Sequence, residues 1–302
     1  MKEKIFIDTD VGDDIDDALA LSLAFSSEEV EVVGITTVMR DTVKRGKTVK
    51  KLAEFYGKNV PVYAGRKRPL DGSEKSETVL IESDAEKYTV DNEEFFNDGE
   101  SAVDFIIYNA EKFGEELTIV GIGPLTNVAA AIEKSPETMK KVKKIIVMGG
   151  AFFNGKLEWN IMSDALAAKI VFESGIPVYA VGTDVTEKLK LNNKRQFEIL
   201  RRTEGVTGFL SGFAKQWIEK RGADLTLHDP LAVYAAFKPN LVHFVKHRVY
   251  VVTEKKPLYG YTLDLSLNGY YKNSSYGSEI FVADYVSAEE TMADFMKRVF
   301  NV

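Results

Sequence analysis

Short apolar runs alternate with longer amphipathic stretches along most of the chain. A short apolar run between turn residues is typical of a buried strand, and apolar positions that recur every three to four residues predict a helix. Strands are predicted at Lys4–Ile7, Val30–Val38, Val60–Tyr63, Leu117–Gly121, Lys144–Met148, Val178–Val181, Arg248–Thr253 and Glu279–Tyr285. Helices are predicted at Ile15–Phe25, Val43–Tyr56, Ser101–Phe113, Leu125–Glu133, Ser163–Glu173 and Ser287–Phe300.

This alternation predicts an α/β fold, with a mostly parallel, Rossmann-like central sheet covered by helices on both faces. No internal repeat or linker divides the chain, so one domain spanning residues 1–302 is expected. In such sheets ligands bind at the carboxyl ends of the strands. The polar segment Arg66–Glu100 has weak periodicity, and it is either a solvated loop or a lid over the site.

Charge and composition exclude several classes of function. The net charge of −7 argues against binding to nucleic acid or to an anionic membrane surface. The absence of cysteine excludes disulfides, thiolate zinc sites and thiol nucleophiles. No apolar run has the length of a signal peptide or of a bilayer span, so a cytoplasmic protein is expected.

Six aspartates crowd the junction between the first strand and the first helix, with no lysine or arginine among them: Asp8, Asp10, Asp13, Asp14, Asp16 and Asp17. Helix capping explains one or two of them. Two like charges 4 Å apart repel by about 1 kcal/mol in water and by several times more in a low dielectric. A cation is therefore expected here, and carboxylates suit calcium or magnesium.

Two families of metal-binding loop fit this junction poorly. An EF-hand needs Asp or Asn at its fifth position and Gly at its sixth, where this chain has Gly12 and Asp13. A magnesium-dependent phosphotransferase of the haloacid-dehalogenase type would use Asp8-Thr9-Asp10 as its nucleophile motif. Such an enzyme does not need the four aspartates that follow, and no convincing lysine motif lies downstream. It remains the less favoured alternative.

The chain as a whole resembles the ribonucleoside hydrolase family, of the inosine-uridine preferring N-ribohydrolase type. The resemblance covers most of the chain, because several motifs occur in the family's order. They are DTDVG at 8–12 with DDALAL at 16–21, ITTV at 35–38, GPLTN at 123–127, VMGG at 147–150, EWN at 158–160 with Asp164, VGTDVT at 181–186 and HDP at 228–230.

This resemblance implies hydrolysis of the bond between ribose C1′ and a base nitrogen, with one bound calcium ion. By position in the motifs, the metal ligands would be Asp10, Asp17, the carbonyl of Thr126 and Asp229. A bound cation lowers the pKa of a water molecule, and Asp10 would accept the proton of that water. His228 would protonate the departing base.

The resemblance also implies a set of ribose-binding residues, namely Asp16, Asp41, Asn154, Glu158 and Asn160, of which Asn154 is the weakest candidate. Three aromatic residues either stack on the base or belong to the core: Phe152, Phe153 and Trp159. His243 and His247 are interpreted as surface residues.

The chain departs from the family pattern at several positions. Two additional residues follow Gly12, so the roles of Asp13 and Asp14 stay open. Arg40-Asp41 replaces a common Gly-Asn, and the segment 66–100 lacks a histidine that some relatives carry, so the base preference is open. A calcium-bound ribose or nucleoside sensor without turnover is the alternative of another class. The family's habit also predicts a homo-oligomer, either a dimer or a tetramer.

Overall fold

The computed structural model describes residues 2–73, 85–92, 99–222, 224–254, 257–266, 269 and 275–302. Its strands are β1 (Glu3–Thr9), β2 (Val30–Thr37), β3 (Val62–Ala64), β4 (Leu117–Gly121), β5 (Lys144–Met148), β6 (Val178–Val181), β7 (Val242–Val251), β8 (Thr262–Asp264) and β9 (Ser278–Val286). Within the described residues they form one nine-stranded sheet in the order β3-β2-β1-β4-β5-β6-β9-β7-β8. Pairing is parallel from β3 to β9, and β7 runs antiparallel to both β9 and β8.

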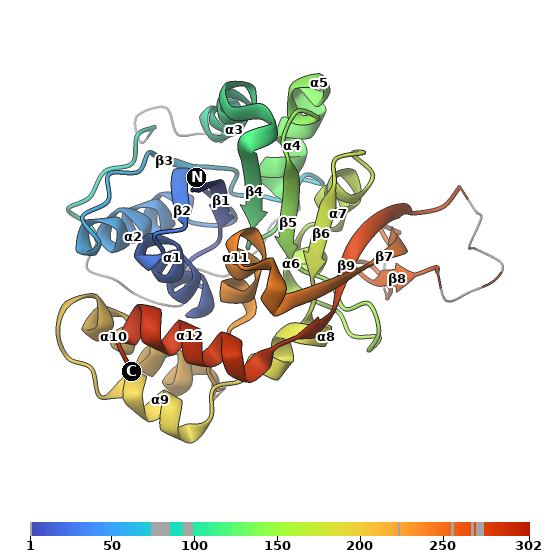
Figure 1. Cartoon of the computed structure of the whole chain (residues 1–302). Helices are drawn as coiled ribbons and strands as arrows, with labels where there is room; N and C mark the ends of the chain where they lie inside the picture. Colours follow the sequence, from blue (N-terminus) through green and yellow to red (C-terminus); the bar gives the residue numbers. More distant parts are fainter. Residues whose placement is uncertain are drawn as a thin grey trace.

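Helices cover both faces of this sheet (Figure 1). They are α1 (Asp16–Ser26), α2 (Thr42–Phe55), α3 (Glu100–Phe113), α4 (Thr126–Lys134), α5 (Pro136–Met139), α6 (Trp159–Ser163), α7 (Ala165–Phe172), α8 (Thr183–Thr186), α9 (Asn193–Leu200), α10 (Gly205–Arg221), α11 (His228–Phe237) and α12 (Ala288–Phe300). Short 3-10 turns occupy Gly114–Glu116, Glu187–Leu189 and Pro239–Leu241. The predicted α/β fold is confirmed.

Two hydrophobic clusters lie on the two faces of the sheet. Successive side chains of a strand point to opposite faces. Accordingly, Ile5 and Ile7 of β1 pack in the cluster that contains residues of α1, α2, α11 and α12. Phe6 lies between them in sequence and packs in the cluster with residues of α3, α4 and α7. Because β1 is buried on both faces, it reads as a continuous apolar run.

The predicted elements differ from the structure mainly near the end of the chain. The strand predicted at Arg248–Thr253 is β7, which begins earlier, at Val242. The prediction missed this first part because exposed polar residues such as His243 and Lys246 interrupt its apolar pattern. The short strand β8 was not predicted. The helix predicted at Ser163–Glu173 is α7, which begins at Ala165 because the side chain of Asp164 caps it by accepting from the amide of Ala167 at 3.0 Å; the short helix α6 before it was not predicted.

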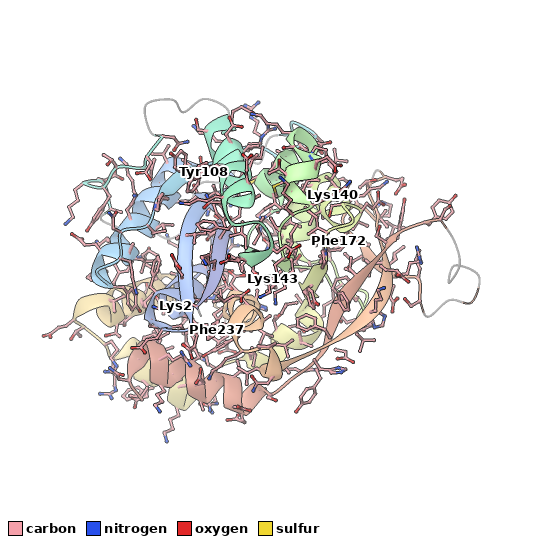
Figure 2. The ribbon with its side chains drawn as sticks, turned by 45° about the horizontal axis from the view of Figure 1, so that its top comes forward. Lys2, Tyr108, Lys140, Lys143, Phe172 and Phe237 are labelled. Atoms are coloured by element: carbon pink, nitrogen blue, oxygen red, sulfur yellow. The ribbon has the colours of Figure 1, made fainter. Side chains whose placement is uncertain are left out.

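The two ends of the parallel strands differ in character. Figure 2 labels Lys2 and Lys143, which lie immediately before β1 and β5, at the end where the strands begin. There the Nζ of Lys143 pairs with both carboxylate oxygens of Glu3 at 2.8 Å, a contact that joins the starts of β5 and β1. The acidic loop, which joins β1 to α1 and carries Asp10, Asp13 and Asp14, lies at the opposite, carboxyl end of the sheet.

Two further expectations concern single segments. Residues 74–84 and 93–98 lie outside the described residues, so the choice between loop and lid for Arg66–Glu100 stays open. None of the described helices combines the length and the apolar composition that a bilayer crossing requires.

Candidate active site

A cavity of about 510 Å³ opens at the carboxyl ends of the central strands. Its acidic lining comes from the β1–α1 loop, the first turn of α1, the segment before α6 and the start of α11: Asp10, Asp13, Asp14, Asp16, Asp17, Glu158 and Asp229. Two arginines and two tryptophans line it as well: Arg40, Trp159, Trp217 and Arg221. These two tryptophans are the only ones in the sequence. The position of the cavity agrees with the expectation that a ligand binds at the carboxyl ends of the strands.

Two helix starts bring the central aspartates together. Asp16 and Asp17 occupy the first turn of α1, and Asp229 occupies the first turn of α11. The positive end of a helix dipole favours carboxylates at such positions. The backbone amide of Asp229 donates to Oδ2 of Asp16 at 3.3 Å, and the hydroxyl of Thr9 donates to Oδ1 of Asp17. Asp16 thus faces α11, whereas Asp17 faces the end of β1.

The electrostatics of this cluster favour a bound cation. Burial raises the pKa of Asp10, Asp17 and Asp229 well above the ordinary value, and neighbouring carboxylates raise these pKa values further. Burial likewise raises the pKa of Asp16 to about 6. A cation among these groups would stabilise their charged forms and reverse the shifts. The donor set is also suitable, since it consists of hard oxygen ligands.

Asp14, whose role the sequence left open, lies in the middle of the cluster. One carboxylate oxygen from each of Asp14, Asp16 and Asp17 lies within 4.8 Å of the others, a spacing that suits a shared metal ion. Oδ1 of Asp14 also accepts the backbone amide of Asp16 at 3.1 Å. Burial and the neighbouring Asp16 raise the pKa of Asp14 well above its usual range. The additional residues of this loop therefore add a carboxylate to the cavity.

Asp13 has a different environment, because two arginines hold it. Nη2 of Arg45 donates to Oδ1 of Asp13 at 2.9 Å, and Nη1 of Arg40 donates to Oδ2 at 2.7 Å. The acidic loop thus has basic partners, supplied by the next strand–helix connection. The sequence did not indicate these pairings, because Arg40 and Arg45 are separated from Asp13 by about thirty residues along the chain.

Arg45 also holds the backbone of the acidic loop. Its side chain is fully buried. Its Nε donates to the carbonyl of Met39 at 2.8 Å, and its Nη1 donates to the carbonyls of Asp10 and Val11, the latter at 3.0 Å. Met39 and Arg40 have positive φ values of 67° and 60°, a conformation that costs non-glycine residues about 1–2 kcal/mol each. Arg45 therefore links the acidic loop to the strained turn at Met39 and Arg40.

Glu158 and Asn160 line the cavity, and both are anchored to the backbone around them. The carboxylate of Glu158 accepts from the amides of Gly150, Asn160 and Ile161 at 2.8–3.1 Å, and so caps α6. Burial raises the pKa of Glu158. Nδ2 of Asn160 donates to the carbonyls of Ile122 and Met148 at 3.0 and 3.1 Å. These bonds fix both side chains at the ends of β4 and β5.

Thr126 does not line the cavity, contrary to its expected position as a metal ligand. It begins α4, it is fully buried, and its hydroxyl donates to Oδ2 of Asp164 at 2.7 Å. The residue of the same loop that does line the cavity is Ile122. It follows β4 directly, and its amide continues the pairing with β1 by donating to the carbonyl of Asp8 at 2.8 Å.

Asp41 and Asn154 also lie away from the cavity lining, although both were expected to bind ribose. The exposed carboxylate of Asp41 caps α2 by accepting the amide of Lys44 at 3.1 Å. The exposed side chain of Asn154 accepts the amide of Lys156 at 3.0 Å. Both side chains serve local turns, as short polar residues commonly do.

His228 begins α11 and lines the cavity. Its Nδ1 lies 2.7 Å from the hydroxyl oxygen of Thr186, the last residue of α8. Burial lowers the pKa of His228, and the carboxylates of Asp14, Glu158 and Glu187 oppose that shift. The ring therefore lies among the carboxylates with one nitrogen already bonded.

The other two histidines and two of the three aromatic candidates lie outside the cavity lining. His243 and His247 pair with Asp284 and Asp264 at 2.7 and 2.8 Å, away from the cavity lining. His243 is exposed as expected, but His247 is partly buried. Of the aromatic candidates, Trp159 lines the cavity, whereas Phe152 belongs to the core and Phe153 packs edge-on against His247. Trp217 lines the cavity too, and no sequence motif pointed to it.

Comparisons with known proteins agree with this geometry. The family model described as inosine-uridine preferring nucleoside hydrolase matches residues 5–293. Uridine nucleosidase 1 of Arabidopsis thaliana is 32% identical over 269 residues, which cover 83% of this chain and 79% of that protein. The pyrimidine-specific ribonucleoside hydrolase RihA of Salmonella typhimurium is 32% identical over 287 residues, 88% of each chain. A solved purine-preferring ribonucleoside hydrolase from Gardnerella vaginalis superposes with a TM-score of 0.83 at 30% identity, covering 99% of this chain and 98% of that one.

Proposed function

The chain belongs to the inosine-uridine preferring nucleoside hydrolase family and is a ribonucleoside hydrolase, and we propose that it works with a calcium ion bound by the acidic cluster. The observation that carries the proposal is the convergence of buried carboxylates on one cavity. Asp10 follows β1, Asp17 lies in the first turn of α1 and Asp229 lies in the first turn of α11, and burial raises the pKa of all three. A cation is the partner that would keep them charged.

The proposed ligands are the carboxylates of Asp10, Asp17 and Asp229 and one backbone carbonyl from the β4–α4 loop. Ile122 is the better donor of that carbonyl than Thr126, because it lines the cavity beside these aspartates. Asp14 lies close enough to Asp16 and Asp17 to join the set. When bound, such an ion lowers the pKa of a coordinated water and so supplies a nucleophile near neutral pH.

The chain's own carboxylates are proposed to carry out the remaining chemistry at the ribose. Asp10 accepts the proton of the attacking water, and Asp16 accepts a ribose hydroxyl hydrogen bond. Glu158 and Asn160 border the same space and are proposed to bind the sugar as well. Positive charge develops on the ribose in the transition state of glycoside cleavage, and a carboxylate-lined cavity stabilises it.

His228 is proposed to protonate the departing base, because its ring lines the cavity and one of its nitrogens is free of the Thr186 contact. The base is proposed to lie against Trp159 and Trp217, whose rings offer apolar surface at the same cavity. The named relatives act on different bases, since one is a uridine nucleosidase, one is pyrimidine-specific and one is purine-preferring. The test therefore uses uridine, cytidine, inosine and adenosine.

The metal assignment is tested with calcium binding and ribose release. The purified protein should bind about one calcium ion tightly, and exhaustive chelation should abolish release of reducing sugar from these nucleosides. Asp10→Ala should lose both calcium binding, measured by calorimetry, and hydrolysis. Asp41→Ala is the matched control, since its carboxylate lies outside the cavity lining and should leave both nearly unchanged.

Full activity after chelation would contradict the metal assignment, and equal losses in the two variants would contradict the choice of ligands. Phosphate release from a phosphoester with magnesium would favour the phosphotransferase alternative instead. Nucleoside and calcium binding without sugar release would favour the sensor. A cytoplasmic location and association into a dimer or tetramer remain predictions, the second of which sedimentation equilibrium measures directly.

A further inference from the structure

The contact between Thr186 and His228 joins two separate elements at the cavity. Thr186 ends α8, which follows β6, and His228 begins α11, 42 positions later in the chain. The Oγ1 of Thr186 lies 2.7 Å from Nδ1 of the imidazole, which is the distance of a good hydrogen bond. The side chain of Thr186 is fully buried, which shields its end of this bond from water.

The direction of the Thr186 side chain is unusual for a helical threonine. A threonine hydroxyl in a helix commonly bonds the carbonyl four residues earlier. In α8 the carbonyl of Gly182 accepts the backbone amide of Thr186, and the hydroxyl of Thr186 instead reaches the histidine ring on α11. Thr291, also fully buried, follows the common pattern by donating to the carbonyl of Ser287 at 2.8 Å.

This bond determines which ring nitrogen is free for chemistry. Because Nδ1 is occupied by Thr186, Nε2 is the nitrogen left for a ligand in the cavity that His228 lines. A hydroxyl can both donate and accept, so it can bond Nδ1 in either protonation state of the ring. In the imidazolium form the Nδ1 proton is donated to Oγ1 of Thr186, and the Nε2 proton points away from it.

The proton balance of base departure fits this arrangement. As the C1′–N bond breaks, its electron pair leaves with the base, and the base takes the Nε2 proton of His228. The oxygen of the attacking water bonds to C1′, and the proton of that water goes to Asp10. His228 is left as a neutral ring with its proton on Nδ1, where the bond to Thr186 already exists, so no rotation of the ring is needed.

The geometry points to Thr186 as a positioning residue that holds His228 with Nε2 directed at the departing base. This inference rests on the acid role proposed above for His228. It assigns to Thr186 no contact with the substrate and no contact with the metal ligands. Its contribution is confined to the leaving-group half of the reaction, which separates it from the ribose chemistry.

Two substrates distinguish this role from a structural one. Uridine or inosine needs a proton on its departing base, whereas the nitrophenolate of 4-nitrophenyl riboside leaves as a stable anion. Thr186→Val removes the hydroxyl and keeps the shape. It should lower kcat on the nucleoside by about 10–100-fold, or roughly 1.4–2.7 kcal/mol, with little change in KM. On the nitrophenyl riboside it should stay within about threefold of the parent, and Thr186→Ser should recover most of the nucleoside activity.

Two controls complete the experiment. Thr291→Val removes an equally buried hydroxyl and should not discriminate between the two substrates. His228→Ala should itself lose 10²–10⁴-fold on the nucleoside and little on the nitrophenyl riboside. The double variant with Thr186→Val should be no slower than His228→Ala alone, because both changes affect the same step.

The outcomes distinguish a failure of the proposed acid role of His228 from a failure of the inference on Thr186. If His228→Ala loses equally on both substrates, or on neither, the proposed acid role fails and the inference on Thr186 fails with it. If His228→Ala discriminates but Thr186→Val loses equally on both substrates, or on neither, only the inference on Thr186 is overturned. Additive losses in the double variant would also overturn it.

Discussion

Arg45→Met tests how the acidic loop is held. The change keeps an unbranched apolar side chain at a fully buried position and removes the guanidinium. That group makes a charged contact of 2.9 Å with Asp13 and donates to the carbonyls of Met39, Asp10 and Val11. All four acceptors belong to the two loops that border the cavity, so the loss concerns the site and the fold together.

The expected loss of stability follows from the burial of this pair. Removing one partner of a buried ion pair typically destabilises a protein by 3–5 kcal/mol. A buried carbonyl left without its donor costs about 1–3 kcal/mol. Asp13 retains Arg40 at 2.7 Å, which moderates the loss. We therefore expect Arg45→Met to lower the free energy of unfolding by about 3–5 kcal/mol.

Equilibrium urea unfolding measures that loss, and calorimetry measures calcium binding. Because Arg45 bonds the backbone of Asp10, calcium affinity should fall by about 10–100-fold, as for other residues that orient metal ligands. Arg201→Met is the control, since Arg201 pairs with Glu198 at the surface with a side chain 49% exposed and should change stability by less than about 1 kcal/mol. A loss below about 1 kcal/mol for Arg45→Met, with unchanged calcium affinity, would refute the reasoning.

Two further predictions concern sugar recognition in the cavity and the buried carboxyl of Asp8. A 2′-deoxyribonucleoside should be a far poorer substrate than its ribonucleoside, mainly through kcat, because hydroxyl contacts strengthen in the transition state; comparable steady-state rates on both would contradict the proposed sugar recognition. Burial raises the pKa of Asp8 to about 7 from 3.8, so the native state keeps a proton that the unfolded chain loses above about pH 4. Stability of the calcium-free protein should therefore fall as pH rises from about 4 to 7, by up to roughly 4 kcal/mol from this group. Asp8→Asn should flatten that slope in urea titrations at several pH values, and parallel slopes in the two proteins would exclude Asp8 as its source.

The sequence by itself determined the architecture around the site. The apolar run of β1, the aspartates that follow it and the apolar start of α1 are contiguous, and local periodicity shows them directly. The alternation of strands and helices also determined that the polar loops after β1, β4 and β5 meet at one edge of the sheet. This topology placed the aspartates after β1 at the ligand-binding edge, whereas Glu158 and Asn160 were expected there only from the family resemblance; Asp10, Asp16, Asp17, Glu158 and Asn160 all line one cavity.

Only the tertiary structure decided which neighbouring side chain turns inward. Arg45 is buried because its guanidinium bonds the acidic loop, and no local pattern separates it from Lys44, Lys47 and Lys50 of the same helix, which stay partly exposed. The fold likewise decided that Ile122 lines the cavity while Thr126 is buried with its hydroxyl bonded to Asp164.

Long-range packing likewise brought Thr186 against His228 and left Asp41 outside the cavity lining. Motif position gives the order of residues along a loop. The direction of each side chain depends on contacts with segments far away in the sequence, and these exist only once the chain has folded.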